Sequence, residues 1–196
     1  DADGRMVKAV NTEGAVTSYT YDKVGRLLSM TDALGHKTSF EYDSMDRVIK
    51  VTDALGNSTT FEYDAVGNVT KETNAKGVDT TYTYDANGNN LTVTDAAGTV
   101  TYTYDALNRV TTVTDRKGNT QKFTYDGASR ITSVTDRNGN KIQYAYDGNG
   151  NIVKTIDALG TEVLFEYDLN GNLIKMTQNR VDEYHEQAET MVTLYE

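Results

Sequence analysis

The sequence predicts an all-β protein, a curved or spiralling antiparallel sheet built from tandem β-hairpins. An aromatic-x-Tyr-Asp phrase, such as Phe61-Glu62-Tyr63-Asp64, returns about every 21 residues, and a period in this range indicates a repeat architecture. Each period carries two turn signals, which leave room for two strands of about six residues. Apolar and polar residues alternate within the strands, as in an antiparallel sheet with one solvated face.

The signature dipeptide of the repeat is Tyr-Asp, and its eight copies are Tyr21-Asp22, Tyr42-Asp43, Tyr63-Asp64, Tyr84-Asp85, Tyr104-Asp105, Tyr125-Asp126, Tyr146-Asp147 and Tyr167-Asp168. Repeats begin at residues 1, 22, 43, 64, 85, 105, 126, 147 and 168. We expect residues 1–177 to form the repeat array and residues 178–196 to be a divergent C-terminal segment. One repeat lacks the residue after Gly98, which predicts a local shift of register in that strand.

Turn chemistry explains the aspartates and glycines. An aspartate or asparagine opens each turn and can bond the backbone two residues on, and a glycine three residues later accepts a left-handed conformation. The first turn, as in Asp22–Arg26, replaces this glycine by Asp46, Asn108 or Ser129 in three repeats. Serine tolerates the left-handed region poorly, so we expect a local change of turn at Ser129.

Alternation places the aromatic side chains on one face, because residues two apart in a strand point the same way. Phe61 and Tyr63 therefore share a face, and 16 of the 18 aromatic residues lie in eight such pairs. The apolar residues of the first strand have the same spacing, so we expect them beside the aromatic pairs. These are Val7 with Ala9, Leu28 with Met30, Ile49 with Val51, Leu91 with Val93 and Ile174 with Met176.

The aromatic ladder is the main candidate for a contact surface. Its rings pack against cross-strand neighbours in the simplest interpretation, but they could also stack on sugar rings or present an apolar wall to an unfolded cargo. The candidate glycan or cargo contacts are Phe40, Phe61, Tyr82, Tyr102, Phe123, Tyr144 and Phe165. Arginines in a slot otherwise taken by asparagine are expected to pair with a signature aspartate of a neighbouring repeat: Arg5, Arg26, Arg47, Arg109 and Arg130.

Composition argues against several classes of function. The net charge is -10, which disfavours nucleic acid or an anionic membrane as partner, since both reward clustered lysine and arginine. The chain has no cysteine, which excludes disulfides and thiolate metal sites. Only 37% of the residues are hydrophobic, so a single thick core is not expected. Two rival folds for a period near 20 residues are a parallel β-solenoid and a β-propeller, which fit the paired turns less well.

Catalytic and metal sites find little support, and we expect no enzyme, cofactor or metal. The two histidines, His36 and His185, lie apart, and His185-Glu186 lacks the second histidine of a zinc protease motif. Carboxylates recur at equivalent positions in every repeat, whereas a catalytic pair should be singular. The stretches Asp1–Gly4 and Asp147–Asn151 resemble calcium loops but lack a glutamate at the twelfth position, which favours turn chemistry.

The segment after Gln178 departs from the repeat pattern, and two interpretations compete. One is an amphipathic helix, whose spacing is followed by Val181, Tyr184, Ala188, Met191 and Tyr195. The other is a degenerate signature strand over residues 192–196. We favour a hybrid, with helical turns over Asp182–Thr190 leading into a last strand. Either form would cover an exposed sheet edge.

The full phrase runs Tyr-Asp, Gly, Arg or Asn, apolar, Thr-Asp, Gly, aromatic-x-Tyr-Asp, and it is similar to the YD repeat of Rhs proteins. That family includes bacterial polymorphic toxins, wall-associated proteins, shell subunits of insecticidal toxin complexes and animal teneurins. The resemblance covers roughly Asp1 to Thr177. It implies a long β-sheet wound into a hollow shell that, in toxin members, encloses a C-terminal effector. The self-cleavage segment and effector domain of that family have no counterpart here.

The expected function is therefore a structural repeat segment of a secreted or cell-surface Rhs-type protein that encloses and delivers a toxin in interbacterial competition. Its expected partners are the remainder of a larger chain and that toxin cargo. The alternative is a carbohydrate-binding or adhesion module that uses the aromatic ladder.

Overall fold

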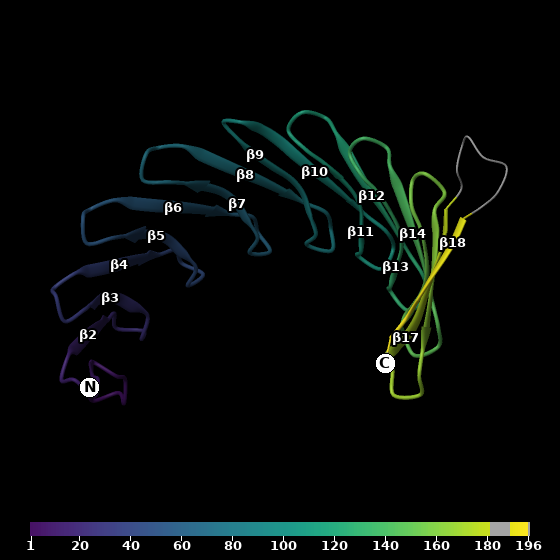
Figure 1. The fold of residues 1–196 in the computed structure, drawn as a ribbon. Helices are drawn as coiled ribbons and strands as arrows, with labels where there is room; N and C mark the ends of the chain where they lie inside the picture. The colour runs from purple at the N-terminus through teal and green to yellow at the C-terminus, as the bar shows by residue number, and fades with distance from the viewer. Residues whose placement is uncertain (181–188, 196) are drawn as a thin grey trace. The chain divides into compact units, whose positions relative to one another are not determined.

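The structure is a computed structural model that describes residues 1–180 and 189–195 of the chain. Its 196 residues divide into two compact units, Asp1–Thr99 and Val100–Glu196. Within each unit every strand pairs antiparallel with the next strand along the chain (Figure 1). The predicted all-β architecture of tandem hairpins is confirmed.

The strands of each unit follow chain order. The first unit contains β1 (Lys8–Val10), β2 (Val16–Tyr21), β3 (Leu27–Thr31), β4 (Lys37–Tyr42), β5 (Val48–Thr52), β6 (Ser58–Tyr63), β7 (Val69–Thr73), β8 (Asp79–Tyr84) and β9 (Asn90–Asp95). The second contains β10 (Gly98–Tyr104), which begins just before the boundary, β11 (Val110–Thr114), β12 (Thr120–Tyr125), β13 (Ile131–Thr135), β14 (Lys141–Tyr146), β15 (Ile152–Ile156), β16 (Glu162–Tyr167), β17 (Leu173–Arg180) and β18 (Glu189–Leu194).

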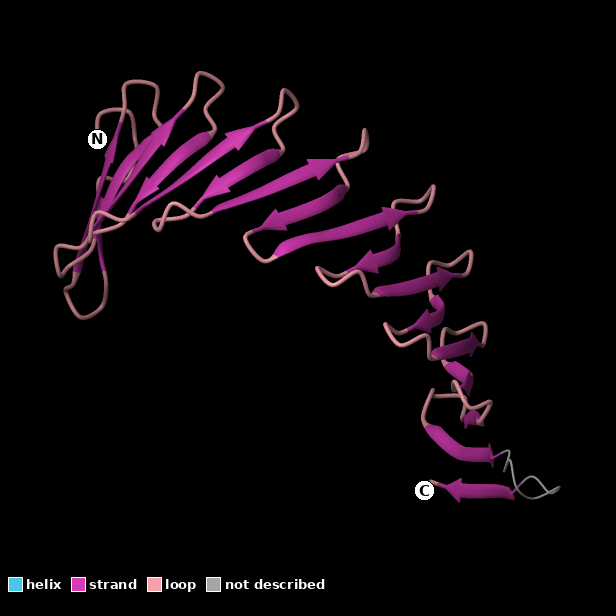
Figure 2. Ribbon diagram, turned by 90° about the horizontal axis from the view of Figure 1, so that it is seen from above, coloured by secondary structure: helices cyan, strands magenta, loops and turns pink. Residues whose placement is uncertain are grey.

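The pairing rejects both rival folds. Neighbouring strands are antiparallel and consecutive in sequence, so neither unit is a parallel solenoid. The ladder of the first unit continues unbroken from β1 to β9, which is incompatible with four-stranded propeller blades. Within each unit the strand direction rotates from hairpin to hairpin, as the natural twist of strands requires (Figure 2).

The two turns of a repeat have the same closed form, except for the shortened turn before Gly98. At the first turn the Asp22 amide donates to the Arg26 carbonyl at 2.9 Å, and the Gly25 amide donates to the Asp22 carbonyl at 3.2 Å. At the second turn Asp53, Gly56 and Asn57 repeat this pattern at 2.9 and 3.1 Å. The carboxylate of the opening aspartate then accepts two further backbone N–H bonds inside the loop. The two turn signals seen in the sequence are therefore one motif used twice per repeat.

The turn at Ser129 keeps this geometry, so the change of turn expected there is wrong. Ser129 has φ 64°, close to the 63° of Asp46 and the 60° of Asn108. Its amide donates to the Asp126 carbonyl at 3.1 Å, as the glycine does in other repeats. The remaining hydrogen bonds of the loop hold serine in a conformation that it does not favour by itself.

The short repeat absorbs its missing residue in the turn, and the register shift expected after Gly98 is wrong. Only Ala96 and Ala97 remain between β9 and Gly98, at which β10 begins. The hydroxyls of Thr94 and Thr99 lie 2.9 Å apart, five residues apart in sequence. The equivalent pair Thr52 and Ser58, also 2.9 Å apart, is separated by six residues. The strand alignment is therefore conserved while the loop shortens.

A β-bulge changes which face the side chains of the first strand of a repeat point to, so the faces expected from strict alternation are wrong there. Between Thr103 and Tyr104 the register shifts so that Thr111 is the extra residue. The hydroxyls of Thr111 and Thr112 both lie within 2.8 Å of the Thr103 hydroxyl, so all three point to the polar face. Thr132 and Ser133 repeat this arrangement around Thr124.

The residue at the equivalent position is the extra one in the other bulged pairings. Ile49 therefore does not share a face with Val51, and strict alternation fails for the equivalent pairs. Those pairs are Leu28 with Met30, Leu91 with Val93 and Ile174 with Met176. At the edge, β1 pairs with β2 without a register shift, so this correction does not extend to Val7 and Ala9.

Each unit is a single layer without a buried apolar core. Among the described residues no hydrophobic side chain is buried, and the aromatic pairs are half-buried by their neighbours within the sheet. Of the residues described, Ser29 and Ser133 alone are buried, at 4% and 5% exposure, and both lie in the hydroxyl rows of the polar face. The sheet is therefore stabilised by its ladder and by contacts along its surface.

The C-terminal segment ends in a strand. β17 and β18 pair antiparallel, from Lys175 opposite Leu194 to Arg180 opposite Glu189. The helical turns expected over Asp182–Thr190 are wrong at their end, because Glu189 and Thr190 belong to β18, and Asp182–Ala188 lies outside the described residues. The part of the chain that is described holds no helix long and apolar enough to span a membrane.

Candidate functional site: links between repeats and the aromatic face

The signature tyrosines join the two strands of each repeat. The Tyr63 hydroxyl donates to the Val48 carbonyl at 2.6 Å, which is 15 residues earlier, at the start of the preceding strand. Tyr21, Tyr42, Tyr84, Tyr125, Tyr146 and Tyr167 make the same bond, at 2.8–2.9 Å, to Met6, Leu27, Val69, Val110, Ile131 and Ile152. This bond explains why the signature position is always tyrosine and never phenylalanine.

The arginines make the complementary link in the forward direction. The Arg47 guanidinium lies over the Tyr63 ring, 4.6 Å from its centre, and its Nη1 donates to the Asp64 carbonyl at 2.8 Å. Its Nε donates to the Asp43 carboxylate, in its own turn, at 2.7 Å. Arg5, Arg26, Arg109 and Arg130 do the same. The expected pairing with a neighbouring signature carboxylate is corrected: the carboxylate and the ring belong to the arginine's own repeat, and the next repeat contributes the carbonyl of its opening aspartate.

The signature aspartates hold the turns. Backbone N–H donation from Arg47, opposed by desolvation and reinforced by the Arg47 side chain, lowers the pKa of Asp43. The pKa of Asp64 is also lowered, chiefly by the side-chain amide of Asn68. These carboxylates are therefore ionised at neutral pH, and their partners are turn donors.

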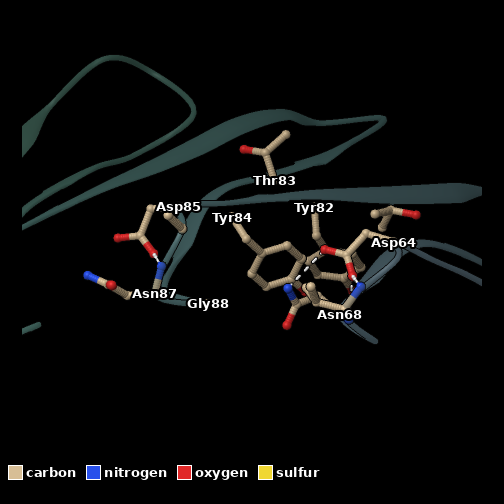
Figure 3. A pocket seen from close by; sticks show the side chains of 11 residues that line it. Asp64, Asn68, Tyr82, Thr83, Tyr84, Asp85, Asn87 and Gly88 are labelled. Carbon is tan, nitrogen blue, oxygen red and sulfur yellow. Dashed lines mark hydrogen bonds between the residues drawn. The ribbon is translucent and has the colours of Figure 1, made fainter.

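Asparagine replaces arginine in other repeats, and it keeps only half of the link. The Asn68 amide donates to the Asp64 carboxylate at 2.9 Å, which imitates the bond of arginine within the turn. Its side chain is too short to cover the ring of Tyr84 at the end of the same repeat. A shallow pocket lies there, with Asn68, Tyr84 and Asp85 among its lining residues (Figure 3).

The other aromatic residue of each pair lies two positions before the signature tyrosine, in the same even-numbered strand. All seven candidate contacts are half-buried on the aromatic face: Phe40, Phe61, Tyr82, Tyr102, Phe123, Tyr144 and Phe165. The sheet brings them into one row within each unit. Whether this row contacts glycan or cargo stays a prediction.

Glu72 is a residue of this face that the sequence analysis missed. It lies on β7 opposite Phe61 on one side and Thr80 on the other. Desolvation, followed by the nearby charge of Glu72, raises the pKa of Tyr82. The signal was present in the sequence, because Glu72 occupies the slot that holds Met30, Val51 and Val93 in other repeats.

The polar face carries cross-strand ion pairs. Lys50 contacts Glu41 at 3.0 Å, Lys71 contacts Asp79 at 2.9 Å, and Lys175 contacts Glu166 at 2.6 Å. Such exposed pairs each contribute little to stability. These ion pairs are typical of a solvated surface, and they recur in several repeats instead of forming one distinct site.

The residues weighed for catalysis and metal binding have turn partners. His36 Nδ1 lies 2.9 Å from the Asp32 carboxylate within one turn, while His185 lies outside the described residues. Asp1 accepts N–H bonds from Asp3 and Arg5, and Asp147 does so from turn residues of its own loop. Within residues 1–180 and 189–195 no group of three or more His, Cys, Asp or Glu side chains is placed to hold a metal ion.

Comparison with known families gives two matches. A family model described as Teneurin YD-shell matches residues 1–141, and one described as RHS Repeat matches residues 125–162 and 146–180. No curated protein gives a significant match.

Solved structures share the fold at low sequence identity. The Photorhabdus luminescens Tc holotoxin pore matches with a TM-score of 0.60 and 16% identity, over 92% of this chain and 12% of that chain. A TcdB2-TccC3 complex matches with a TM-score of 0.60 and 14% identity, over 92% and 14%. A TcdB2-TccC3-Cdc42 structure gives 0.57 and 19%, over 90% and 10%. The chain thus spans about an eighth of the length of these proteins.

Proposed function

The chain belongs to the Teneurin YD-shell family, and from this membership we propose that it is a wall segment of a β-shell that encloses a toxin cargo before delivery. In this proposal the segment works as part of a larger secreted or cell-surface protein, and its role is structural rather than enzymatic. The partners are the remaining repeats of that protein and a cargo polypeptide on the aromatic side.

The single-layer construction carries the proposal. An isolated globular domain normally buries its large apolar side chains, whereas the described residues bury none. The aromatic rows are instead spread over one face of a thin sheet, in which tyrosine bonds join the strands of a repeat and arginine bonds join a repeat to the next one. This arrangement suits a wall that is stable in itself and that presents a mildly apolar surface to enclosed chain.

The carbohydrate-binding alternative receives no support from the matched families or structures. The geometry also weakens it, because the hydroxyls of signature tyrosines such as Tyr63 and Tyr146 already donate to backbone carbonyls. A sugar site on this face would need those hydroxyls or a singular cluster of polar groups.

Limited proteolysis of the full-length protein that contains this segment tests the proposal. We expect the domain that follows the repeats to resist protease while the shell is intact. It should become cleavable when Tyr63 and Tyr84 are both replaced by alanine, because two successive links are then lost. Equal cleavage of that domain in both proteins would overturn the enclosure, and saturable polysaccharide binding lost on Phe61→Ala would favour the carbohydrate alternative.

A further inference from the structure

The slot over Tyr84 has the acceptor geometry that receives a guanidinium elsewhere in the chain. One repeat earlier, Arg47 lies over the Tyr63 ring and donates to the Asp64 carbonyl. The corresponding ring and carbonyl of the next repeat belong to Tyr84 and Asp85. Tyr84 keeps the standard orientation, since its hydroxyl donates to the Val69 carbonyl at 2.8 Å.

The side chain that should fill this slot stops short of it. Asn68 Nδ2 is engaged by the Asp64 carboxylate. Its Oδ1 lies 3.9 Å from where a Cβ on Gly88 would stand, on the wall of the pocket. At the equivalent Gly25, the nearest atom is Arg5 Nη1 at 3.6 Å. Asn68 therefore places an acceptor oxygen near the position that a guanidinium nitrogen occupies in another repeat.

Two carboxylates near the pocket favour a cation. Asp64 is bonded by the neutral amide of Asn68, whereas Asp43 is neutralised by Arg47. The same repeat carries Glu72 on the aromatic face, close enough to Tyr82 to raise the pKa of its hydroxyl, and Tyr82 also lines the pocket. Loss of a fixed cation and gain of a carboxylate thus coincide in one repeat.

We propose that this pocket binds an arginine side chain of a separate polypeptide that lies along the aromatic face. The guanidinium stacks on Tyr84 and donates to the Asp85 carbonyl and to Asn68 Oδ1. Figure 3 shows Tyr82, Tyr84 and Asn68 among the side chains that line this pocket. The methylene stem then covers the neighbouring ring of Tyr82. Lysine fits less well, because an ammonium lacks the planar stacking surface. The proposal is independent of toxin enclosure.

A titration of the complete chain with capped Gly-Arg-Gly peptide, followed by NMR of labelled tyrosine rings, tests this site. We expect saturable shifts of Tyr84 and Tyr82 with a Kd on the order of millimolar, as for one cation–π contact with two exposed hydrogen bonds. Capped Gly-Lys-Gly should bind at least about 3-fold more weakly. Tyr63, which Arg47 already covers, should not shift.

Matched variants separate this site from general attraction to an acidic protein. Asn68→Arg should abolish the shifts, because the chain then fills its own slot as it does in five other repeats. Asn151→Arg, the same change over Tyr167 in the second unit, should leave the Tyr84 titration unchanged. Glu72→Gln should weaken binding about 2- to 5-fold, as for one partly screened charge.

Three results would overturn the proposal. One is an unchanged titration of the Asn68→Arg protein, and another is equal shifts with the lysine peptide or with sodium chloride at matched ionic strength. The third is guanidinium ion binding as tightly as the arginine peptide, which would make this a small-cation site rather than a polypeptide contact.

Discussion

Replacing Tyr63 by phenylalanine tests the hydrogen bond that joins β5 and β6, the two strands of one repeat. The change removes only the hydroxyl that donates to the Val48 carbonyl at 2.6 Å, and it leaves the ring under Arg47 in place. A hydrogen bond of this kind contributes about 0.5–1.5 kcal/mol to the free energy of unfolding. For a chain of this size each kcal/mol corresponds to a shift of about 2–4 °C in Tm, so we expect Tm to fall by about 1–6 °C.

The matched control is Tyr144→Phe. Tyr144 occupies the other position of an aromatic pair, at which Phe40, Phe61, Phe123 and Phe165 occur naturally, so its hydroxyl should be dispensable. Thermal and urea unfolding followed by circular dichroism measure both variants, and amide exchange near Val48 reports the local effect. If the two variants lose the same stability, or neither loses any, the tyrosine hydroxyl does not hold the two strands of a repeat together.

Three further predictions concern the turns and the arginine link. Arg47→Asn should lower the free energy of unfolding by about 1–2 kcal/mol, because it removes the ring stack and the bond to the next repeat. A double-mutant cycle with Tyr63→Leu should show coupling between Arg47 and Tyr63. Ser129→Gly should raise stability by about 0.5–1 kcal/mol by relieving the left-handed strain, while Gly127→Ala, outside that region, should not lower it. Acid should destabilise the fold, because folding lowers the pKa of aspartates such as Asp43. The stability that these carboxylates contribute is complete above their ordinary pKa of 3.8 and is lost as the pH falls through their pKa in the folded protein. Unfolding midpoints measured between pH 6 and pH 2 would reveal this loss.

The repeat pattern was sufficient to predict the hairpins, and the reason is local. Each strand is bounded by an aspartate and a residue in the left-handed region, and these two positions fix the turn without help from distant contacts. Strand pairing between neighbours then follows directly. The order of the strands within each unit could therefore be derived from spacing alone.

The faces of the first strand and the partners of arginine could not be derived in this way. Alternation assumes a regular ladder, and a bulge at each repeat reverses the side of residues such as Ile49 and Thr111. The arginine partner depends on the offset between adjacent hairpins, which determines that Arg47 meets the Tyr63 ring and the Asp64 carbonyl. At Ser129, the hydrogen bonds that close the loop hold the residue in the left-handed region despite the low propensity of serine for that region.

The short reach of the repeat links has a consequence for how the chain acquires its structure. The Tyr63 hydroxyl bonds a carbonyl 15 residues earlier, and Arg47 bonds one 17 residues later. Each repeat can therefore close its own strand pair, and its arginine can reach the next turn, as soon as about one more repeat has emerged from a ribosome or a secretion channel. Contacts so local in sequence favour rapid ordering. The chain can thus gain structure progressively from its N-terminal end, without waiting for a distant partner segment.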